Sequence, residues 1–321
     1  MRTVFFGTPA IAVPALQALT EISEVVGVVC QPDRPAGRGR KLTAPPVKRV
    51  ALDLGLDVHQ PLKVKTGTLH EWLAARETDV AVVMAYGRIL PEAVLNAPRN
   101  GCMNLHASLL PKYRGAAPIN WCLVQGEERT GISLMQMDQG MDTGPVYCSR
   151  SVPIDSDDDA GSLTDKLARL AAIAVREDLP RAVGGEFEAK PQDETLATYA
   201  PLIERHDTRI DFSRPAREVV NLVRGMSPRP GAHTTLRGSI FKVHRFTLAD
   251  ETPRTDAPPG LVSIVPDRRV VVACGAGTVE LEQAQPAGRR IQTARDLING
   301  RMIQAGDVLG RDDRWDPQPT P

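Results

Sequence analysis

The sequence has little of what marks a membrane, secreted or strongly nucleic-acid-binding protein. Lys plus Arg and Asp plus Glu are both 39, so the formal net charge is zero and any electrostatic binding surface must be local. No run reaches ~18 uninterrupted apolar residues, so neither a membrane-spanning helix nor a membrane partner is expected. The amino-terminal apolar run is interrupted at Gly7-Thr8-Pro9 and no small-residue cleavage site follows, so no signal peptide is expected. We therefore expect a cytoplasmic protein, and 321 residues leave room for about two domains.

Several motifs of metal, cofactor and nucleophile sites are also missing. The five cysteines form no CxxC pair and mostly fall in apolar, strand-like runs, so we expect reduced, buried thiols. The turn FGTPAIAVP lacks G-x-G-x-x-G, and no G-x-x-x-x-G-K-[ST] occurs, so neither a nicotinamide cofactor nor an ATP phosphate has its usual binding loop. No metal is predicted, because metal-ligand spacing is absent among His59, His70, His206, His233 and His244.

Short apolar strands alternate with helical patterns through the first half of the chain. Strands are expected at TVFF, EVVGVVC, LDVHQ, DVAVVMA, CMNLH, GISLMQM and VYCSRSV, and Thr8 is expected to cap the first helix. This alternation predicts an α/β fold with a Rossmann-like, mostly parallel sheet and helices on both faces. A second pattern follows in AHTTL, SIFKVHRFTL, GLVSIV, RVVVACG and TVELEQ, which predicts a small C-terminal β-barrel of OB type.

These patterns divide the chain into domains. We expect a catalytic domain at 1–189, a linker at 190–206, an OB-like domain at 207–310 and a frayed tail at 311–321. The linker is placed in the polar stretch PQDETLATYAPLI, which has two prolines and little periodicity. No heptad pattern occurs, so nothing beyond a monomer is expected.

The stretch NLHASLLPKYRG carries the first chemical indication. Asn104 and His106 lie two residues apart at the end of an apolar strand, so the alternation of side chains puts both polar groups on one face. In parallel sheets the ligand crevice lies beyond the carboxyl ends of the strands. The loop DQGMDTG follows another strand, so Asp138 and Asp142 are expected to reach the same edge.

An amide, an imidazole and a carboxylate suit acyl or formyl transfer to an amine. In that reaction the attacking nitrogen loses a proton and the carbonyl oxygen gains negative charge. Asn104 can donate to the oxyanion, His106 can donate or relay a proton, and Asp142 is expected to hold the histidine tautomer. No G-x-S-x-G occurs, so direct transfer is favoured over a covalent intermediate. The alternative is a structural histidine, with Asp138 only capping a turn.

A second indication is the basic segment RPAGRGRKLTAPPVKR at 34–49. It holds six basic residues and no acidic ones, together with three prolines and two glycines. Such a flexible, cationic insertion is suited to binding phosphates, and the alternative is a solvated surface loop. Its position beyond the carboxyl end of a strand favours a polyanionic substrate.

Several segments together resemble one enzyme family. The chain closely resembles the methionyl-tRNA formyltransferases of bacteria and organelles over about 1–310, in FGTPAIAVPALQAL, QPDRPAGRGRKLTAPPVK, VVMAYGRILP, GCMNLHASLLPKYRGAAPIN, TGISLMQMDQGMDTGPV, QPAGRR and LINGR. The resemblance implies transfer of a formyl group from 10-formyltetrahydrofolate to the α-amino group of initiator methionyl-tRNA for translation initiation, releasing tetrahydrofolate.

The resemblance is more specific for the chemistry than for the acceptor. The Asn, His, Asp arrangement and the SLLP turn also resemble glycinamide ribonucleotide and sugar-nucleotide formyltransferases, so the tRNA acceptor rests on the basic segment and the C-terminal domain. A sugar-nucleotide formyltransferase and a non-enzymatic tRNA-binding module therefore remain alternatives.

The resemblance also implies roles for individual residues. Asn104, His106 and Asp142 are the implied catalytic trio. The implied folate contacts are Ser108, Leu109, Leu110 and Pro111, with Tyr86 and Gly87 in the loop 85–91, and the implied tRNA contacts are Arg38, Arg40 and Lys41. The chain departs from the family pattern at Arg229, where many members have an aromatic residue, and at PLIERHD, which lacks a common Lys.

Overall fold

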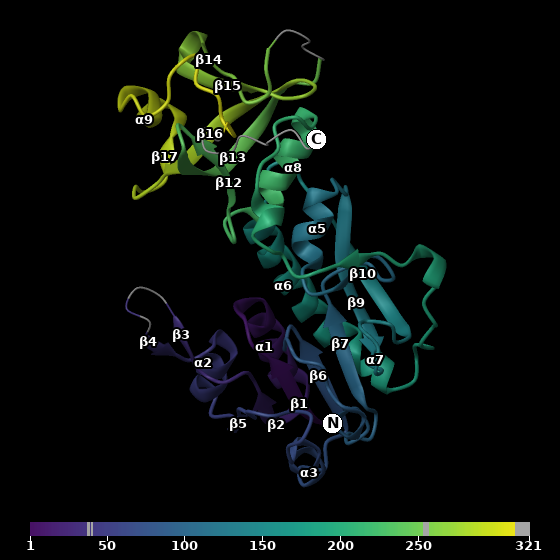
Figure 1. Ribbon diagram of the computed structural model, residues 1–321. Coiled ribbons are helices and arrows are strands. Elements are labelled where there is room, and N and C mark those ends of the chain that lie inside the picture. The colour runs from purple at the N-terminus through teal and green to yellow at the C-terminus, as the bar shows by residue number, and fades with distance from the viewer. Residues whose placement is uncertain (37–38, 40, 253–256, 312–321) are drawn as a thin grey trace, which may run out of the picture. The chain divides into compact units, whose positions relative to one another are not determined.

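The computed structural model describes residues 1–36, 39, 41–252 and 257–311 (Figure 1). These residues form two compact units. The first comprises Met1–Pro118, Arg129–Ile154 and Thr164–Pro201, and the second comprises Ile119–Glu128, Asp155–Leu163 and the described residues from Leu202 onward. No helix in the described ranges is long and apolar enough to cross a membrane.

A mixed sheet forms the centre of the first unit, with strand order β10-β9-β7-β6-β1-β2-β5 (Figure 1). The strands are β1 (Arg2–Gly7), β2 (Glu24–Val29), β5 (Val58–His59), β6 (Val80–Met84), β7 (Cys102–His106), β9 (Arg129–Gln136) and β10 (Val146–Pro153). Neighbours from β5 to β7 are parallel, whereas β9 is antiparallel to both β7 and β10. The predicted Rossmann-like, mostly parallel sheet is confirmed.

Helices cover the strands because these strands are apolar on both faces. Every residue of β6 and β7 is buried, as expected for strands inside a parallel sheet. On one face, Leu69, Leu73 and Val94 pack with Phe6 and Val83 of the sheet. The helices of this part of the chain are η1 (Ala10–Ala12), α1 (Val13–Ile22), α2 (Pro46–Asp53), α3 (Leu69–Ala74), α4 (Glu92–Leu95), α6 (Ala160–Glu177) and α7 (Leu179–Val183).

The predicted helix cap at Thr8 is wrong. Pro9 precedes η1, and no side chain caps that helix. The Thr8 hydroxyl instead donates to the Tyr86 carbonyl at 3.2 Å and accepts from the Gln31 amide at 3.3 Å. A tertiary partner on a neighbouring strand end has replaced the local one, a competition that is common for threonine hydroxyls.

Two short strand pairs lie outside the central sheet. In the basic segment, β3 (Arg34–Ala36) pairs with β4 (Lys41–Thr43), so its described part contains an antiparallel strand pair. Farther along, β8 (Arg114–Gly115) pairs in parallel with β11 (Tyr199–Ala200), which follows η2 (Glu194–Leu196). Part of the segment expected to be a linker is therefore bonded to the first unit.

The second unit is built around an antiparallel sheet in the order β12-β13-β16-β15-β14, with β17 paired to β16. Its elements are α5 (Pro118–Val124), η3 (His206–Thr208), α8 (Ala216–Met226), β12 (Ala232–Leu236), β13 (Ser239–Asp250), β14 (Val262–Val265), η4 (Pro266–Arg268), β15 (Arg269–Ala273), β16 (Thr278–Pro286), β17 (Gln292–Thr293) and α9 (Ala294–Asn299). Val219 and Val223 of α8 pack with Phe241 and Phe246 of β13. The strand-rich C-terminal domain is confirmed, and closure into an OB-type barrel stays a prediction.

Candidate active site

Asn104 and His106 lie at the carboxyl end of β7, on the same face of the sheet. Asn104 is in register with Val83 of β6, and β1 and β6 end together, with Gly7 opposite Met84. The loops after β6 and β7 therefore leave the sheet at one edge, where ligands bind in folds of this class. Asn104 and His106 are 8% and 6% exposed, so both polar groups are largely withdrawn from water.

Asp142 reaches these residues by a different route from the one expected. Because β9 is antiparallel to β7, its carboxyl end lies beside the amino end of β7, with Gln136 opposite Met103. The loop after β9 therefore starts at the edge of the sheet opposite to the one where β7 ends. The Asp142 carboxylate nevertheless reaches the end of β7, where it lies near Asn104 and His106.

The three side chains converge on one another. The distance from Asn104 Nδ2 to Asp142 Oδ1 is 3.5 Å, and the distance from His106 Nδ1 to Asp142 Oδ2 is 3.6 Å. Both separations are at or beyond the limit of a direct hydrogen bond, so the carboxylate faces both groups without being tightly bonded to either.

A backbone carbonyl fixes the tautomer of His106. Nε2 lies 2.9 Å from the Tyr113 carbonyl oxygen. That oxygen can only accept, so Nε2 carries a proton and Nδ1 is the ring atom that faces Asp142. The expected orienting carboxylate is thus replaced by the Tyr113 carbonyl, and Nδ1 is left facing Asp142 Oδ2 at 3.6 Å.

Asp142 itself is held in an uncommon backbone conformation. Its φ is +55°, in the left-handed region that residues other than glycine seldom adopt. Its Oδ2 accepts a hydrogen bond of 2.8 Å from the Gly115 amide, on β8. A charge-assisted bond of this kind fixes the carboxylate more firmly than a neutral one would.

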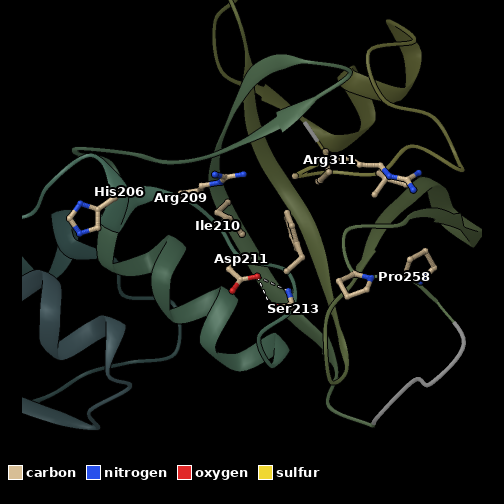
Figure 2. A pocket seen from close by; sticks show the side chains of 12 residues that line it. His206, Arg209, Ile210, Asp211, Ser213, Pro258 and Arg311 are labelled. Carbon is tan, nitrogen blue, oxygen red and sulfur yellow. Dashed lines mark hydrogen bonds between the residues drawn. The ribbon is translucent and has the colours of Figure 1, made fainter. Parts of the chain in front are cut away.

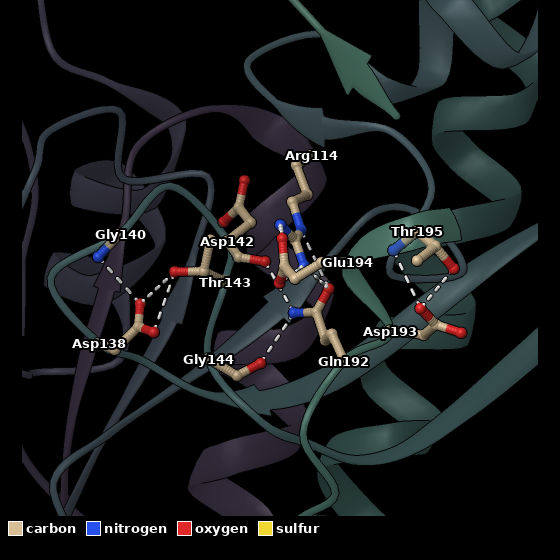
Figure 3. Close-up of polar contacts among 10 residues, drawn as sticks. All are labelled: Arg114, Asp138, Gly140, Asp142, Thr143, Gly144, Gln192, Asp193, Glu194 and Thr195. Carbon is tan, nitrogen blue, oxygen red and sulfur yellow. Dashed lines mark hydrogen bonds and ion pairs between the residues drawn. The ribbon is translucent and has the colours of Figure 1, made fainter. Parts of the chain in front are cut away.

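A buried arginine and two side chains from the segment 190–206 lie beside this loop, and one of the two, Gln192, bonds to its backbone (Figure 3). Arg114 donates to both carboxylate oxygens of Glu194 at 2.8 Å, and to Gln192 Oε1 at 2.9 and 3.1 Å. These bonds to Glu194 raise the pKa of Arg114, and the guanidinium in turn lowers the pKa of Glu194. The sequence interpretation missed both partners because they lie in a stretch without periodicity.

Asp138 takes the role that the sequence left as the alternative. Its carboxylate accepts from the Gly140 amide at 3.0 Å and from the Thr143 hydroxyl at 2.8 and 2.9 Å (Figure 3). It therefore stabilises the turn that precedes Asp142. No contact with Asn104 or His106 is found for it among the described residues.

The SLLP turn is bonded to the sheet beneath it. Ser108 is buried, its hydroxyl donates to the Lys112 carbonyl at 2.6 Å, and its carbonyl accepts from the Ser133 hydroxyl at 2.8 Å. The Leu110 amide donates to the same Ser133 oxygen at 3.1 Å. Leu109, Leu110 and Pro111 are half-buried. Ser108 thus holds the turn in place, and the three residues after it form the accessible part.

The loop after β6 is held in place by packing of the Tyr86 ring and by hydrogen bonds from Gln31. The Tyr86 ring is buried and meets Phe6 edge-on, with ring centroids 5.3 Å apart, and burial raises the pKa of its hydroxyl to about 12. Gln31 donates to the Tyr86 and Gly87 carbonyls at 2.9 and 3.3 Å. Gly87 is exposed, whereas Tyr86 contributes its ring to the core.

Of the expected tRNA contacts, the structure places Lys41 in an exposed position on β4. Arg38 and Arg40 lie outside the described residues. Arg229, which departs from the family pattern, is exposed in the turn before β12.

A cavity of about 600 Å³ lies in the second unit, away from the trio in sequence (Figure 2). Asp211 on its wall accepts from the Ser213 amide at 2.9 Å and hydroxyl at 2.6 Å. His206, Arg209 and Arg311 also line it. The cavity is therefore rich in groups that can meet a polyanion.

The cysteines are free thiols, as expected, and four of the five are buried. Burial raises the pKa of Cys102 and of Cys274 to about 12. Thiols with such pKa values are poor nucleophiles at neutral pH. Within the described residues, no group of three or more His, Cys, Asp or Glu side chains is arranged to hold a metal ion.

Sequence comparisons identify close relatives. The family model described as "Formyl transferase" matches residues 1–179, and that described as "Formyl transferase, C-terminal domain" matches residues 202–302. The methionyl-tRNA formyltransferase of Sorangium cellulosum (strain So ce56) is 57% identical over 97% of this chain and 100% of its own length. That of Myxococcus xanthus (strain DK1622) is 45% identical over 95% of this chain and 96% of its own.

Solved structures support the same fold. WlaRD, a sugar 3N-formyl transferase crystallised in the presence of dTDP and 5-N-formyl-THF, aligns with a TM-score of 0.66 at 17% identity, covering 90% of this chain and 99% of that one. HypX from Aquifex aeolicus in complex with tetrahydrofolic acid aligns with a TM-score of 0.61 at 17% identity, covering 95% of this chain and 48% of that one. At such identities the likeness concerns the fold, whereas the family follows from the sequence matches. The chain belongs to the formyl transferase family and, within it, to the methionyl-tRNA formyltransferases.

Proposed function

We propose that this protein transfers the formyl group of 10-formyltetrahydrofolate to the α-amino group of initiator methionyl-tRNA. The observation that carries the proposal is the convergence of Asn104, His106 and Asp142 at the sheet edge. The full-length similarity to curated methionyl-tRNA formyltransferases supports the choice of acceptor. The products are N-formylmethionyl-tRNA and tetrahydrofolate.

The geometry suggests a division of labour in the reaction. The amine nitrogen attacks the formyl carbon, and the carbonyl oxygen becomes an oxyanion to which the Asn104 amide donates. The attacking nitrogen loses its proton to the pair formed by Asp142 and His106 Nδ1, which lie 3.6 Å apart. Collapse of the tetrahedral species breaks the bond to the folate nitrogen, which leaves with a proton. Asn104, His106 and Asp142 are the proposed catalytic residues.

The folate is proposed to bind between the loop 85–91 and the SLLP turn. Gly87 is exposed in the first, and Leu109, Leu110 and Pro111 are half-buried in the second. Ser108 and Tyr86 are proposed to act indirectly, by holding these two segments in place. The Ser108 hydroxyl bonds within the turn, and the Tyr86 ring lies in the core. Solved relatives of this fold have been crystallised with folate derivatives, which is consistent with this placement.

The tRNA is proposed to meet both units. Arg38, Arg40 and Lys41 of the basic segment are the proposed contacts near the aminoacyl end, and the C-terminal domain contacts the body of the tRNA. The basic side chains that line the cavity of Figure 2 are consistent with this. We place the protein in the cytoplasm as a monomer that needs no metal ion.

The proposed function is tested by offering the same donor to three acceptors. Purified protein is incubated with 10-formyltetrahydrofolate and with methionyl initiator tRNA, free methionine or a sugar-nucleotide amine. Formylation of the charged tRNA alone supports the proposal. Formylation of the sugar-nucleotide amine with unmodified tRNA would show that the chemistry is right and the acceptor wrong. Binding of tRNA without formylation would favour a non-enzymatic binding module.

A further inference from the structure

Gln192 binds the backbone of the loop that carries Asp142. Its Nε2 donates to the carbonyl oxygens of Asp142 and Gly144, at 2.8 Å in both cases (Figure 3). One of these carbonyls belongs to Asp142 itself, where φ is +55°, and the other lies two residues farther along the same loop. A residue in a sparsely populated backbone region keeps that conformation only when its surroundings hold it there.

Arg114 and Glu194 determine the orientation of Gln192. The Arg114 side chain is fully buried, and its Nε and Nη2 both donate to Gln192 Oε1. The Gln192 amide oxygen is therefore fixed, and its NH2 must point at the loop. Glu194, whose side chain is 67% exposed, supplies the negative charge that a buried guanidinium requires.

The strand pair of β8 and β11, together with the residue before β8, also orients His106. The Tyr113 carbonyl bonds His106 Nε2, and two residues later the Gly115 amide bonds Asp142 Oδ2. Backbone hydrogen bonds from Arg114 to Thr198 and from Ala116 to Ala200 join this stretch to the segment 190–206. Both members of the proton-transfer pair are thus held by groups on or beside β8 and β11.

We propose that Gln192 is a positioning residue, which keeps Asp142 in the conformation that presents its carboxylate to Asn104 and His106. This inference rests on the proposed function for the catalytic role of Asp142. This role of Gln192 is separate from its pairing with Arg114. Its Oε1 accepts from Arg114, whereas its Nε2 donates to the backbone of the Asp142 loop.

The substitution Gln192→Glu separates these two roles. The introduced carboxylate keeps an acceptor for Arg114, so a residue needed only for that pairing would tolerate the change. Where the NH2 group donated, however, a charged oxygen would face two carbonyl oxygens and repel them. We expect turnover to fall about 10- to 100-fold, as displacement of a reacting group by an ångström does, with KM for both substrates within about threefold.

Protonation of the introduced carboxylate gives a second readout. A protonated carboxyl group can again donate to one of the two carbonyls, so turnover relative to the unaltered protein should recover as the pH is lowered. A merely structural loss would keep this ratio constant. Gln17→Glu, at an exposed position of α1, is the matched control, with the same change in charge outside the loop and the residues bonded to it, and should leave turnover unchanged.

A structural measurement makes the test independent of activity. In a crystal structure of Gln192→Glu, we expect the distance from the Gly115 nitrogen to Asp142 Oδ2 to exceed the 2.8 Å found here. Turnover within twofold of the unaltered protein, or an unchanged distance, would overturn the role of Gln192. If the unaltered protein formylates none of the acceptors, the proposed function fails, while the distance still decides whether Gln192 positions Asp142. Thermal unfolding of each variant confirms that it is folded.

Discussion

Gly115 is the residue at which a single methyl group should disable the site. Its φ is +119°, and a Cβ built there would lie 2.8 Å from the Ala200 carbonyl oxygen on β11. No backbone atom can remain so close to a methyl group, so β8 and β11 would have to separate. Because the Gly115 amide also bonds Asp142 Oδ2, the substitution Gly115→Ala would shift the carboxylate.

The magnitude follows from what the separation breaks. A residue with a side chain in this backbone region costs about 1 to 3 kcal/mol. The Ala200 carbonyl accepts from the Ala116 and Ala117 amides at 2.9 and 3.1 Å, and each such bond contributes about 0.5 to 1.5 kcal/mol net. We therefore expect a destabilisation of about 3 kcal/mol in the first unit. Turnover should fall about 100-fold, because the carboxylate moves by a large part of an ångström.

The assay compares formyl transfer and urea unfolding for Gly115→Ala and Gly185→Ala. Gly185 also has a positive φ, +79°, but a Cβ there meets no atom within 4 Å. The control therefore has the backbone cost of about 1 to 2 kcal/mol without the collision, and its turnover should match that of the unaltered protein. If folded Gly115→Ala retains turnover within threefold of the unaltered protein, the Gly115 amide does not position Asp142.

Three further predictions concern the trio, the basic segment and pH. Asn104→Ala, His106→Ala and Asp142→Ala should each lower turnover at least ~100-fold while the protein stays folded; near-normal turnover in one would remove that residue from the mechanism. Replacing Arg38, Arg40 and Lys41 with Ala should raise KM for tRNA but not for folate, and flatten the salt dependence of tRNA binding by about one unit of slope per contact; Arg169→Ala, exposed on α6, should do neither. Burial raises the pKa of Cys102 from 9.0 to about 12, so the thiol loses its proton at lower pH in the unfolded chain than in the folded one. The free energy of unfolding should therefore fall as the pH rises above about 9. Urea unfolding of Cys102→Ala should show a smaller fall over the same pH range, and an equal fall would contradict the argument.

The elements of the fold were predictable where periodicity is strong. CMNLH and AHTTL became β7 and β12 with the expected bounds. Alternating burial leaves one choice of face for each residue of β12, whereas β7 is buried throughout and was recognisable as a short apolar run. The strand pair of β3 and β4 was not expected, since Pro and Gly dominate that segment and hide the pairing. A strand pattern in the sequence also does not show whether the strand runs parallel or antiparallel to its neighbour. Because β9 is antiparallel to β7, the loop that carries Asp142 starts at the opposite edge of the sheet from His106.

The hydrogen bonds that hold the side chains of the site in place were harder to predict, because they come from main-chain carbonyl and amide groups rather than from particular side chains. His106 is oriented by a main-chain carbonyl and Asp142 by a main-chain amide, and no side-chain motif encodes either. The sequence offered a carboxylate near an imidazole, so a direct bond was the natural expectation. The distance from His106 Nδ1 to Asp142 Oδ2 is instead 3.6 Å, which is too long for a direct hydrogen bond.

One indication of Gln192 and Glu194 was nevertheless present in the sequence. Arg114 stands in LLPKYRGAAP, between apolar and small residues, and an arginine buried in such a stretch needs a carboxylate partner. Asp193 and Glu194 are adjacent acidic residues in the stretch predicted to be a linker, after α7. A polar segment without periodicity is therefore a candidate partner for a buried charge, and what resembles a linker can complete an active site. In this chain it is bonded to Arg114, beside the loop that presents Asp142 to His106.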